Sequence, residues 1–367
     1  MSDTDNNDVE SSASSGRLDY IILGQGICGT FLSYYLLKAG KKVLVIDESK
    51  PFTASKAASG VINPVTGRRI VRTWRIEELL PFALEAYEDL GREINMYLIK
   101  SISILDFHAS TQMKEAFVKR MLEGEDYLQI PPDAGEWTNY FNFYFGVGAV
   151  SPSLLIDLNT MLSTWRQKLK EKDLLLEEVF DWNECSNETN HIAYKNIKAD
   201  KVICCDGVAG FDNPYFNKLP YAKIKGEAII ARIPTLPATY IYKQGLSIVP
   251  WKQDLFWIGS SYEWNYDDVL PTTSFLRKVE THLQQWLKMP YTIVDHFASE
   301  RPATIERRPF VGVHPHHPSV AIFNGMGTKG CSLAPFFAYQ LTKHLLEQQP
   351  LYAEVDVQRF KRILMPI

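Results

Sequence analysis

Short apolar runs separated by glycine-rich turns dominate the first fifty residues of the chain. Residues 18–23 form an apolar run of strand length, residues 27–38 have the length and composition of a helix that ends at Gly40, and residues 42–47 are a second apolar run. Buried parallel strands read as continuous apolar stretches, so this pattern predicts a strand–helix–strand unit. The chain is therefore expected to open as an α/β protein.

The middle of the chain follows a different pattern. Residues 221–262 alternate strand-length runs with turns at glycine or proline, which predicts antiparallel strands. Further strands are expected at 139–150, 201–205 and 321–324, and helices at 76–95, 153–170, 272–288 and 332–346. The two ends thus read as α/β, with an antiparallel sheet from the middle laid over them.

Composition and charge exclude several classes of protein. The 367 residues are 46% hydrophobic with a formal net charge of −4, which suits a globular chain and gives no general attraction for nucleic acid. Five cysteines without a CxxC pair argue against a disulfide framework and favour a reducing cytoplasm. The acidic, serine-rich residues 1–16 lack the features of a secretory signal and predict a disordered tail. With no apolar run of about 18 residues, no membrane span is expected.

The turn after the first strand carries a GxGxxG pattern at Gly24, Gly26 and Gly29. In a dinucleotide-binding unit, the first glycine permits a tight turn, the second lets the backbone approach a pyrophosphate, and the third lets helix and strand pack closely. Asp47 follows the second strand, where an acid accepts hydrogen bonds from a ribose diol. The pattern and its context predict dinucleotide binding, with FAD and NAD both open.

Two further glycine-rich segments bear on which dinucleotide is bound. Residues 57–67 follow the acid-bearing strand, and residues 324–330 precede a helix near the C-terminus, where backbone amides and a helix N-terminus form an anion site. Reduced flavin develops negative charge at its pyrimidine end, which such a site stabilises. Two distant glycine loops suit a long, buried FAD, while an ordinary helix entry stays open as an alternative for the second loop.

Together these segments resemble the D-amino-acid oxidase superfamily of FAD-dependent oxidoreductases, in particular its glycine oxidase and sarcosine oxidase branch. The opening GQGICGT, AASGVINP (57–64), GAVSPSLLIDL (148–158), KVICCDG (201–207), KGEAII (225–230) and ERPATIERRPFVG (300–312) fall in the family's order. IFNGMGTKGCSLAP (322–335) is similar to the family's closing loop and helix. The resemblance covers nearly the whole chain.

The resemblance implies a Rossmann-like FAD-binding domain at 17–100, 146–215 and 300–367, and an interleaved antiparallel-sheet (α+β) substrate domain at 101–145 and 216–299. It also implies hydride transfer from a small amine or amino acid to non-covalent FAD, giving an imine, with Arg301 clamping a substrate carboxylate and Lys329 beside the flavin as catalytic residues. Motif and resemblance place the cofactor contacts at Gly24, Gly26, Ile27, Cys28, Gly29, Asp47, Glu48, Ser59, Gly60, Val61, Val179, Asp206, Gly207, Met326, Gly327, Thr328, Lys329 and Gly330.

The chain departs from the family's pattern at two positions. Leu246 and Ser247 stand where the glycine oxidase pattern has a tyrosine, and Trp257 stands where sarcosine oxidases have a lysine that helps activate oxygen. The electron acceptor therefore stays open. The sequence also leaves the oligomeric state open. These departures also keep open a flavin-binding protein without turnover.

A second alternative inside the superfamily is an FAD domain that modifies the wobble uridine of tRNA. Arg68, Arg69, Arg72 and Arg75 at 67–75 fit either an anion funnel above the active site or a solvated helix face. The histidines of 314–317 lack a fourth ligand at a suitable spacing, so no metal site is predicted.

Overall fold

The opening strand–helix–strand unit forms as its apolar pattern predicts. In the computed structural model, which describes residues 16–67, 69–131, 133–188 and 191–365, β1 spans Leu18–Leu23, α1 spans Ile27–Lys38 and β2 spans Val43–Ile46. β1 and β2 pair in parallel. Gly40 follows α1 with a φ of 75°, a left-handed conformation that glycine adopts without steric cost and that ends the helix.

The first sheet collects strands from both ends of the chain and from its middle. Within the described residues it has eight strands, with β19, β12, β1, β2 and β9 parallel in that order. β18 is antiparallel to β19, and the β10–β11 hairpin extends the sheet from β12. The bounds are β9 Leu175–Leu176, β10 Cys185–Glu188, β11 His191–Tyr194, β12 Ile197–Cys204, β18 Phe310–Val313 and β19 Val320–Asn324.

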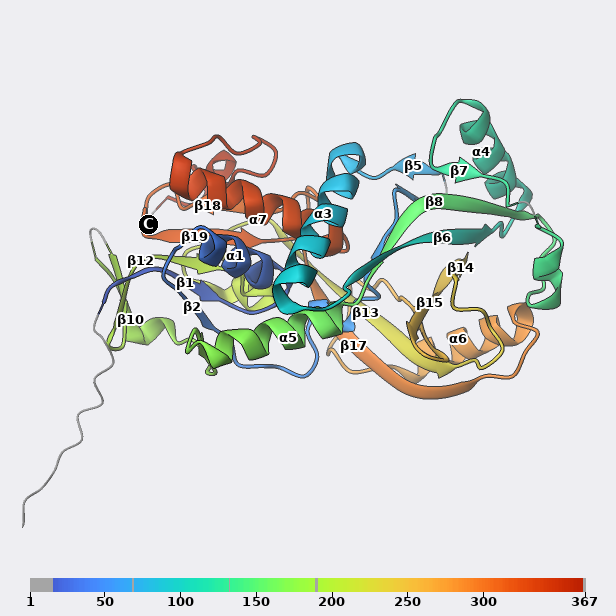
Figure 1. Ribbon diagram of the computed structural model, residues 1–367, viewed down its shortest axis with the longest axis horizontal. Coiled ribbons are helices and arrows are strands. Elements are labelled where there is room, and N and C mark those ends of the chain that lie inside the picture. The colour runs from blue at the N-terminus through green and yellow to red at the C-terminus, as the bar shows by residue number, and fades with distance from the viewer. Residues whose placement is uncertain (1–15, 68, 132, 189–190, 366–367) are drawn as a thin grey trace, which may run out of the picture.

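Four helices cover one face of this sheet. They are α1, α3 (Ile76–Ile94), α5 (Leu158–Glu171) and α7 (Gly330–Glu347), and they share one buried apolar cluster with Tyr20 and Ile22 of β1. Ile21 and Leu23 of the same strand belong to a separate cluster on the opposite face. Because β1 is buried on both faces, its sequence is an unbroken apolar run. Figure 1 shows α1 and α7 next to each other over the first sheet.

The second sheet is larger and mostly antiparallel. Its order is β17-β13-β16-β15-β14-β6-β8-β3, with β7 beside β8, which makes nine strands in the described part of the chain; only β6 and β14 pair in parallel. The bounds are β3 Val61–Ile62, β6 Ile99–Phe107, β7 Leu128–Gln129, β8 Val147–Ile156, β13 Tyr221–Arg232, β14 Tyr240–Gln244, β15 Leu246–Lys252, β16 Leu255–Gly259 and β17 Thr292–Thr304.

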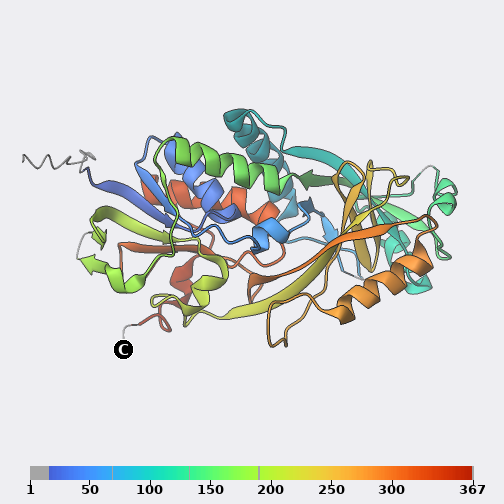
Figure 2. The same cartoon turned by 90° about the horizontal axis from the view of Figure 1, so that it is seen from below.

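Helix α6 (Thr273–Trp286) packs against one face of the second sheet. Its buried Phe275, Val279 and Leu283 join a cluster with Ile229, Ile258 and other residues of the sheet. Figure 2 shows α6, in orange, along the end of the molecule that lies away from the first sheet. The opposite face of the second sheet belongs to a separate buried cluster.

The remaining elements are short. Helices α2 (Ala54–Ala57) and α4 (Thr111–Leu122), the β4–β5 hairpin (Val65–Thr66 and Val71–Arg72) and four 3₁₀ turns (Glu136–Asn139, Trp182–Glu184, Gly207–Asp212 and Val357–Phe360) connect the larger ones. No described helix has both the length and the apolar character needed to cross a lipid bilayer. The five cysteines are all free thiols. The predicted tail falls almost wholly outside the described residues.

Two predicted elements are wrong at their boundaries. Residues 139–146 are not a strand, because Phe141 packs on Trp286 of α6 (ring centroids 4.7 Å apart) and only Val147 begins β8. The helix expected from 153 starts at Leu158, since β8 continues to Ile156 and the Asp157 side chain accepts a hydrogen bond from Thr160 N (3.0 Å) as the helix cap. β8 therefore lies in the second sheet, although the range 146–215 expected for the FAD-binding domain contains all of it.

Candidate active site

The turn between β1 and α1 has the tight geometry that its glycines predict. A Cβ on Gly29 would lie 1.9 Å from the carbonyl oxygen of Gly24, and a Cβ on Gly24 would lie 2.6 Å from that of Cys205. Gly24 also has a φ of 93°. Side chains at either position would require the backbone to move, so only glycine keeps the N-terminus of α1 this close to β1. The backbone amides and partial positive charge of that helix end favour an anion.

Asp47 lies one residue beyond β2, beside this turn. Its carboxylate accepts hydrogen bonds from Gln25 N (2.8 Å) and Ser49 N (2.9 Å) and pairs with Arg166 Nη1 (2.6 Å). Arg166 comes from α5 and also pairs with Glu177 at 2.7 Å. Sequence reasoning missed Arg166, because a single arginine in an amphipathic helix carries no signal of the strand end that it will meet.

The segment after β2 returns to the N-terminus of α1. Ile27 N donates a hydrogen bond to Ser55 Oγ (3.0 Å), and Gly26 is so close that a Cβ there would lie 3.1 Å from the same oxygen. Gly60 has a φ of 80°, and a Cβ on it would lie 2.1 Å from the Ile156 carbonyl oxygen. Its neighbour Val61 then starts β3, which pairs with β8. The start of the predicted loop 57–67 is thus held between α1 and the second sheet.

The C-terminal glycine loop is held by a buried polar brace. Asn324, at the end of β19, donates hydrogen bonds to Asp206 Oδ1 (3.0 Å) and to the Gly207 carbonyl oxygen (2.8 Å), which follow β12. Burial raises the pKa of Asp206 to about 6. Gly327 has a φ of 55°, and its amide donates to the Pro302 carbonyl oxygen (2.9 Å). The loop therefore packs directly against β17, one residue from Arg301.

The N-terminal and C-terminal glycine loops meet at the start of α1. A Cβ on Gly330 would lie 3.5 Å from Ile27 Cγ2, which is van der Waals contact. The second sheet reaches the same region, because Trp257 Nε1 donates a hydrogen bond to the Ala57 carbonyl oxygen (3.0 Å). Three segments far apart in the sequence thus converge where β17 and β16 of the second sheet adjoin the first.

Arg301 lies on β17, with its guanidinium laid over β13. Its Nη2 donates to Ser260 Oγ (2.8 Å) and its Nη1 to the Ser261 carbonyl oxygen (3.3 Å). A Cβ on Gly226 would lie only 1.9 Å from Nη2, so glycine makes room for the guanidinium. Burial lowers the pKa of Arg301 below its ordinary value. Its described hydrogen-bond partners are neutral oxygens, since the adjacent Glu300 accepts a bond from Tyr266 instead.

Lys329 is the residue that caps α7 at its N-terminus. Its Nζ lies 3.5 Å from Thr73 Oγ1, in the segment that follows the β4–β5 hairpin. Burial, together with the positive charge of Lys243 on β14, lowers the pKa of Lys329 to about 8. Lys329 therefore faces both the segment that leads into α3 and the second sheet, and it keeps its proton at neutral pH but loses it as the pH rises through about 8.

The other predicted cofactor residues are spread around this region. Cys28 and Met326 are buried, Ser59 and Gly330 are half-buried, and Thr328 is exposed. Glu48 pairs with Lys50 at 2.7 Å, and Val179 is 66% exposed beyond β9. Their contacts with a cofactor stay predictions.

The arginine segment 67–75 is not a helix, and its charges are matched by acids. Arg72 lies on β5 and pairs with Glu125 (2.9 Å) and Glu77 (2.7 Å), while Arg75 pairs with Glu78 (2.8 Å). Helix α3 begins only at Ile76. Arg68 lies outside the described residues, so of the four only Arg69, which is exposed and forms no ion pair with a described residue, keeps the character of an anion funnel.

The residues at the convergence fit the FAD that the resemblance implies. The α1 N-terminus offers its helix-end amides to a pyrophosphate, behind a turn in which a Cβ at Gly24 or Gly29 would clash with backbone, and Asp47 stands beside it for a ribose. The loop 324–330 brings backbone amides and Lys329 to the edge of the second sheet, where negative charge on a flavin would be matched. The donor set therefore suits an extended dinucleotide that runs from the first sheet to the second.

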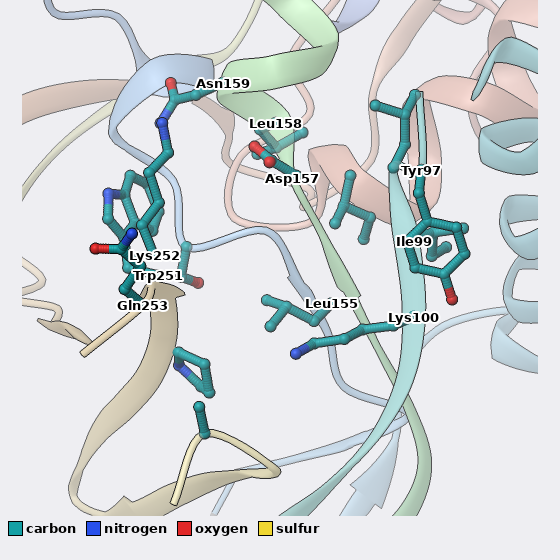
Figure 3. Close-up of a pocket in the computed structure, with 15 residues that line it drawn as sticks. Tyr97, Ile99, Lys100, Leu155, Asp157, Leu158, Asn159, Trp251, Lys252 and Gln253 are labelled. Atoms are coloured by element: carbon teal, nitrogen blue, oxygen red, sulfur yellow. The ribbon is translucent and has the colours of Figure 1, made fainter. Parts of the chain in front are cut away.

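A pocket of about 230 Å³ opens beside this region at Ser59. Its walls come from the start of β6, the end of β8, the N-terminus of α5 and the turn between β15 and β16. Figure 3 shows the Lys100 side chain reaching into it across from Trp251, Lys252 and Gln253. Neither Arg301 nor Lys329 lines it, so it is separate from the residues predicted to bind substrate.

Comparisons with known proteins agree with this architecture. A family model described as FAD dependent oxidoreductase (DAO) matches residues 19–344. The glycine oxidase of Bacillus licheniformis is 24% identical over 353 residues, which cover 87% of this chain and 90% of the relative.

Two solved structures share the fold over nearly the whole chain. The structure of glycine oxidase from Geobacillus kaustophilus has a TM-score of 0.72 at 17% identity and covers 91% of this chain and 96% of its own. That of iminodiacetate oxidase from Chelativorans sp. BNC1 has a TM-score of 0.73 at 17% identity, with 93% and 98% covered. The predicted fold class, an α/β FAD-binding architecture with an overlying sheet, is confirmed.

Proposed function

The chain belongs to the family of FAD-dependent oxidoreductases, as an amine or amino-acid oxidoreductase, and from this premise we propose that it oxidises the C–N bond of a small amino acid whose carboxylate is held by Arg301. One observation carries the proposal: a half-buried guanidinium at the convergence of the glycine loops, bonded only to neutral oxygens among the described residues. A planar, two-oxygen anion is the natural partner of such a group.

The residues of the glycine turn, Asp47 and the loop 324–330 would hold FAD. When bound, FAD supplies the oxidant that takes a hydride from the carbon beside the amine, leaving an imine that water hydrolyses to a carbonyl compound and an amine or ammonia. The chain's own residues then have three tasks, which are to bind the substrate, to orient it and to match charge.

Arg301 binds and orients the substrate in this proposal. Gly226 beneath it and the oxygens of Ser260 and Ser261 beside it fix the guanidinium in one place. A carboxylate bound to a guanidinium in two hydrogen bonds cannot rotate, so the neighbouring C–N bond is presented in one orientation. A guanidinium does not give up its proton, so the anion site persists over the whole working pH range.

Lys329 holds the second positive charge. With a pKa of about 8 it is protonated at neutral pH and loses its charge as the pH rises further. Its position at the start of α7 adds a full charge to the partial positive charge of that helix end. We propose that this charge stabilises the electron-rich product state of the reaction.

We further propose that the second sheet, with α4 and α6, forms the substrate domain, and that the first sheet and its four helices form the FAD-binding domain.

A cytoplasmic location suits the five free thiols. For the tRNA-modifying alternative we find no support, because Arg72 and Arg75, two arginines of the segment 67–75, are paired with acids.

Anaerobic titration of the flavin-loaded protein with a panel of amines and amino acids tests the proposal. We expect at least one amino acid to bleach the flavin absorbance, and its decarboxylated amine to do so at least about tenfold less efficiently. Arg301→Gln should abolish this difference, whereas Arg232→Gln, at an exposed position on β13, should retain it. No bleaching by any member of the panel would leave a flavin-binding protein without turnover.

A further inference from the structure

A polar cluster closes around Asp47, at the edge of the predicted dinucleotide site. It joins Asp47 to Gln25 of the glycine turn, Arg166 of α5 and Glu177 beyond β9. The side chains of Arg166 and Asp47 are only 13% and 21% exposed. Polar groups at such positions are expected to have partners, so matching each donor to its acceptor shows which groups are left for a ligand.

Arg166 has every N–H of its guanidinium engaged within the chain. A guanidinium carries about five N–H donors, one on Nε and two on each Nη. Nε donates to Glu177 Oε1 (3.1 Å), Nη1 to Asp47 Oδ1 (2.6 Å) and Gln25 Oε1 (3.2 Å), and Nη2 to the Asp47 carbonyl oxygen (3.1 Å) and Glu177 Oε1 (2.7 Å). A phosphate could bind Arg166 only by breaking some of these bonds. The arginine therefore acts on a ligand through Asp47.

Asp47 has one acceptor position left. A carboxylate offers about four lone pairs, which is two on each oxygen. Oδ1 accepts hydrogen bonds from Arg166 Nη1 (2.6 Å) and from Ser49 N (2.9 Å), which uses both of its positions. Among the described residues, Oδ2 accepts a hydrogen bond from Gln25 N alone (2.8 Å). One position on Oδ2 therefore stays open to a donor from outside the chain.

Gln25 places this open position next to the glycine turn. Its buried side chain donates through Nε2 to Thr30 Oγ1 (3.0 Å) and to the Leu162 carbonyl oxygen (3.1 Å), which ties the turn to α1 and α5. The backbone N–H of Gln25 is the group that holds Asp47 Oδ2. Oδ2 is thus the carboxylate oxygen beside the turn where the pyrophosphate is expected, and Oδ1 is the oxygen held by α5.

The number of open positions decides how a ribose is held. In a dinucleotide-binding unit the acid after the second strand accepts a hydrogen bond from the adenosine ribose, which carries a 2′- and a 3′-hydroxyl. Holding both hydroxyls takes two open acceptor positions. Asp47 has one, because Arg166 and Ser49 saturate Oδ1. The carboxylate is therefore suited to one hydroxyl.

We propose that Arg166 is a positioning residue of the cofactor site: by occupying Asp47 Oδ1, it makes Asp47 select one hydroxyl of the adenosine ribose through Oδ2. The ligand class is the adenosine diphosphate half of a dinucleotide. This inference concerns the cofactor and not the substrate, so it stands or falls independently of Arg301.

Binding of ADP, 2′-deoxy-ADP and 3′-deoxy-ADP to the full-length protein freed of flavin, measured by isothermal titration calorimetry, tests the inference without turnover. The three probes share the adenine and the pyrophosphate and differ by one hydroxyl. We expect one deoxy form to bind at least about tenfold more weakly than ADP, and the other to stay within about threefold of ADP, because a hydrogen bond to a charged group has this strength.

Two outcomes with the wild-type protein would overturn the inference. Equal weakening by both deletions would mean that Asp47 holds both hydroxyls. Equal binding of all three probes, or no binding of ADP, would mean that Asp47 accepts no ribose hydroxyl.

The variant Arg166→Met removes the donors and frees Asp47 Oδ1 while it keeps an unbranched side chain. Oδ1 can then accept the second hydroxyl, so the affinities of the two deoxy forms should differ by less than about threefold. This ratio compares two ligands on one protein, so a general loss of stability or affinity leaves it unchanged. Arg232→Met, at an exposed position on β13, should keep the wild-type ratio. An Arg166→Met protein with the full selectivity would refute the positioning role.

A second variant keeps the test decisive if Arg166→Met does not fold. Asp47→Ala removes the acceptor itself, so ADP and both deoxy forms should bind it with affinities within about threefold of one another. Selectivity that persists in Asp47→Ala would come from another group and would overturn the inference.

Discussion

Replacing Gly226 by alanine adds a single methyl group beneath the guanidinium of Arg301. The new Cβ would lie 1.9 Å from Nη2, 2.2 Å from Cζ and 2.4 Å from Nη1. Normal contact between non-bonded atoms needs about 3.5 Å, so the guanidinium has to move by more than an ångström. Gly226 is not one of the described glycines with a positive φ, so its backbone conformation suits alanine. The effect of the added methyl group therefore falls on Arg301.

The expected loss follows from the hydrogen bonds that Arg301 makes. Charge-assisted hydrogen bonds to a carboxylate contribute about 1.5–3 kcal/mol, which corresponds to a factor of roughly ten to a hundred in kcat/KM. We expect a loss of this size for the amino-acid substrate. For the corresponding amine without a carboxylate, the change should stay below about threefold, because that substrate does not use Arg301.

The assay is the rate of flavin reduction by a matched amino acid and amine, measured for the wild type and for Gly226→Ala. Gly135→Ala is the control, since its Cβ would meet nothing within 4 Å and its φ is −71°. Overpacking costs about 1–3 kcal/mol of stability, so retained flavin and the melting temperature are measured alongside. An unchanged kcat/KM for the amino acid, or an equal loss for both substrates, would refute the role given to Arg301.

Three other predictions follow from the structure. Gly29→Ala should abolish FAD binding, seen as a loss of flavin absorbance per protein, because its Cβ would lie 1.9 Å from the Gly24 carbonyl oxygen; wild-type flavin content would contradict the tight turn. Flavin reduction should slow as the pH rises through about 8, where Lys329 loses its proton. Lys329→Met should reduce the flavin slowly at every pH and show no such step. An identical step in the variant would assign this pH dependence to another group. Glu227→Ala should lower the free energy of unfolding by about 3–5 kcal/mol in urea titrations, because Glu227 is fully buried and its removal leaves the buried Lys225 without this counter-charge. A change below about 1 kcal/mol would show that the Lys225–Glu227 pair is not stabilising.

Local features of the chain were predictable from the sequence where the structure of a segment depends only on its own residues. The strand, the helix and the glycine turn at 18–46 form where their apolar pattern and glycines place them. Where an apolar run suits either state, the prediction was wrong: residues 153–156 continue β8, because they pair with β3 and β6 rather than starting a helix. The pairing partners lie some 50 to 90 residues earlier, and no local signal identifies them.

The sequence by itself determined that the chain carries a dinucleotide-binding turn and a second glycine loop, because these depend on backbone freedom and residue chemistry within a few positions. Only the tertiary structure decided that Arg166 meets Asp47 and that Gly226 makes room for Arg301. Each of those contacts joins elements separated by at least 70 residues, and the register of distant strands and the packing of helices, not the local sequence, bring them together.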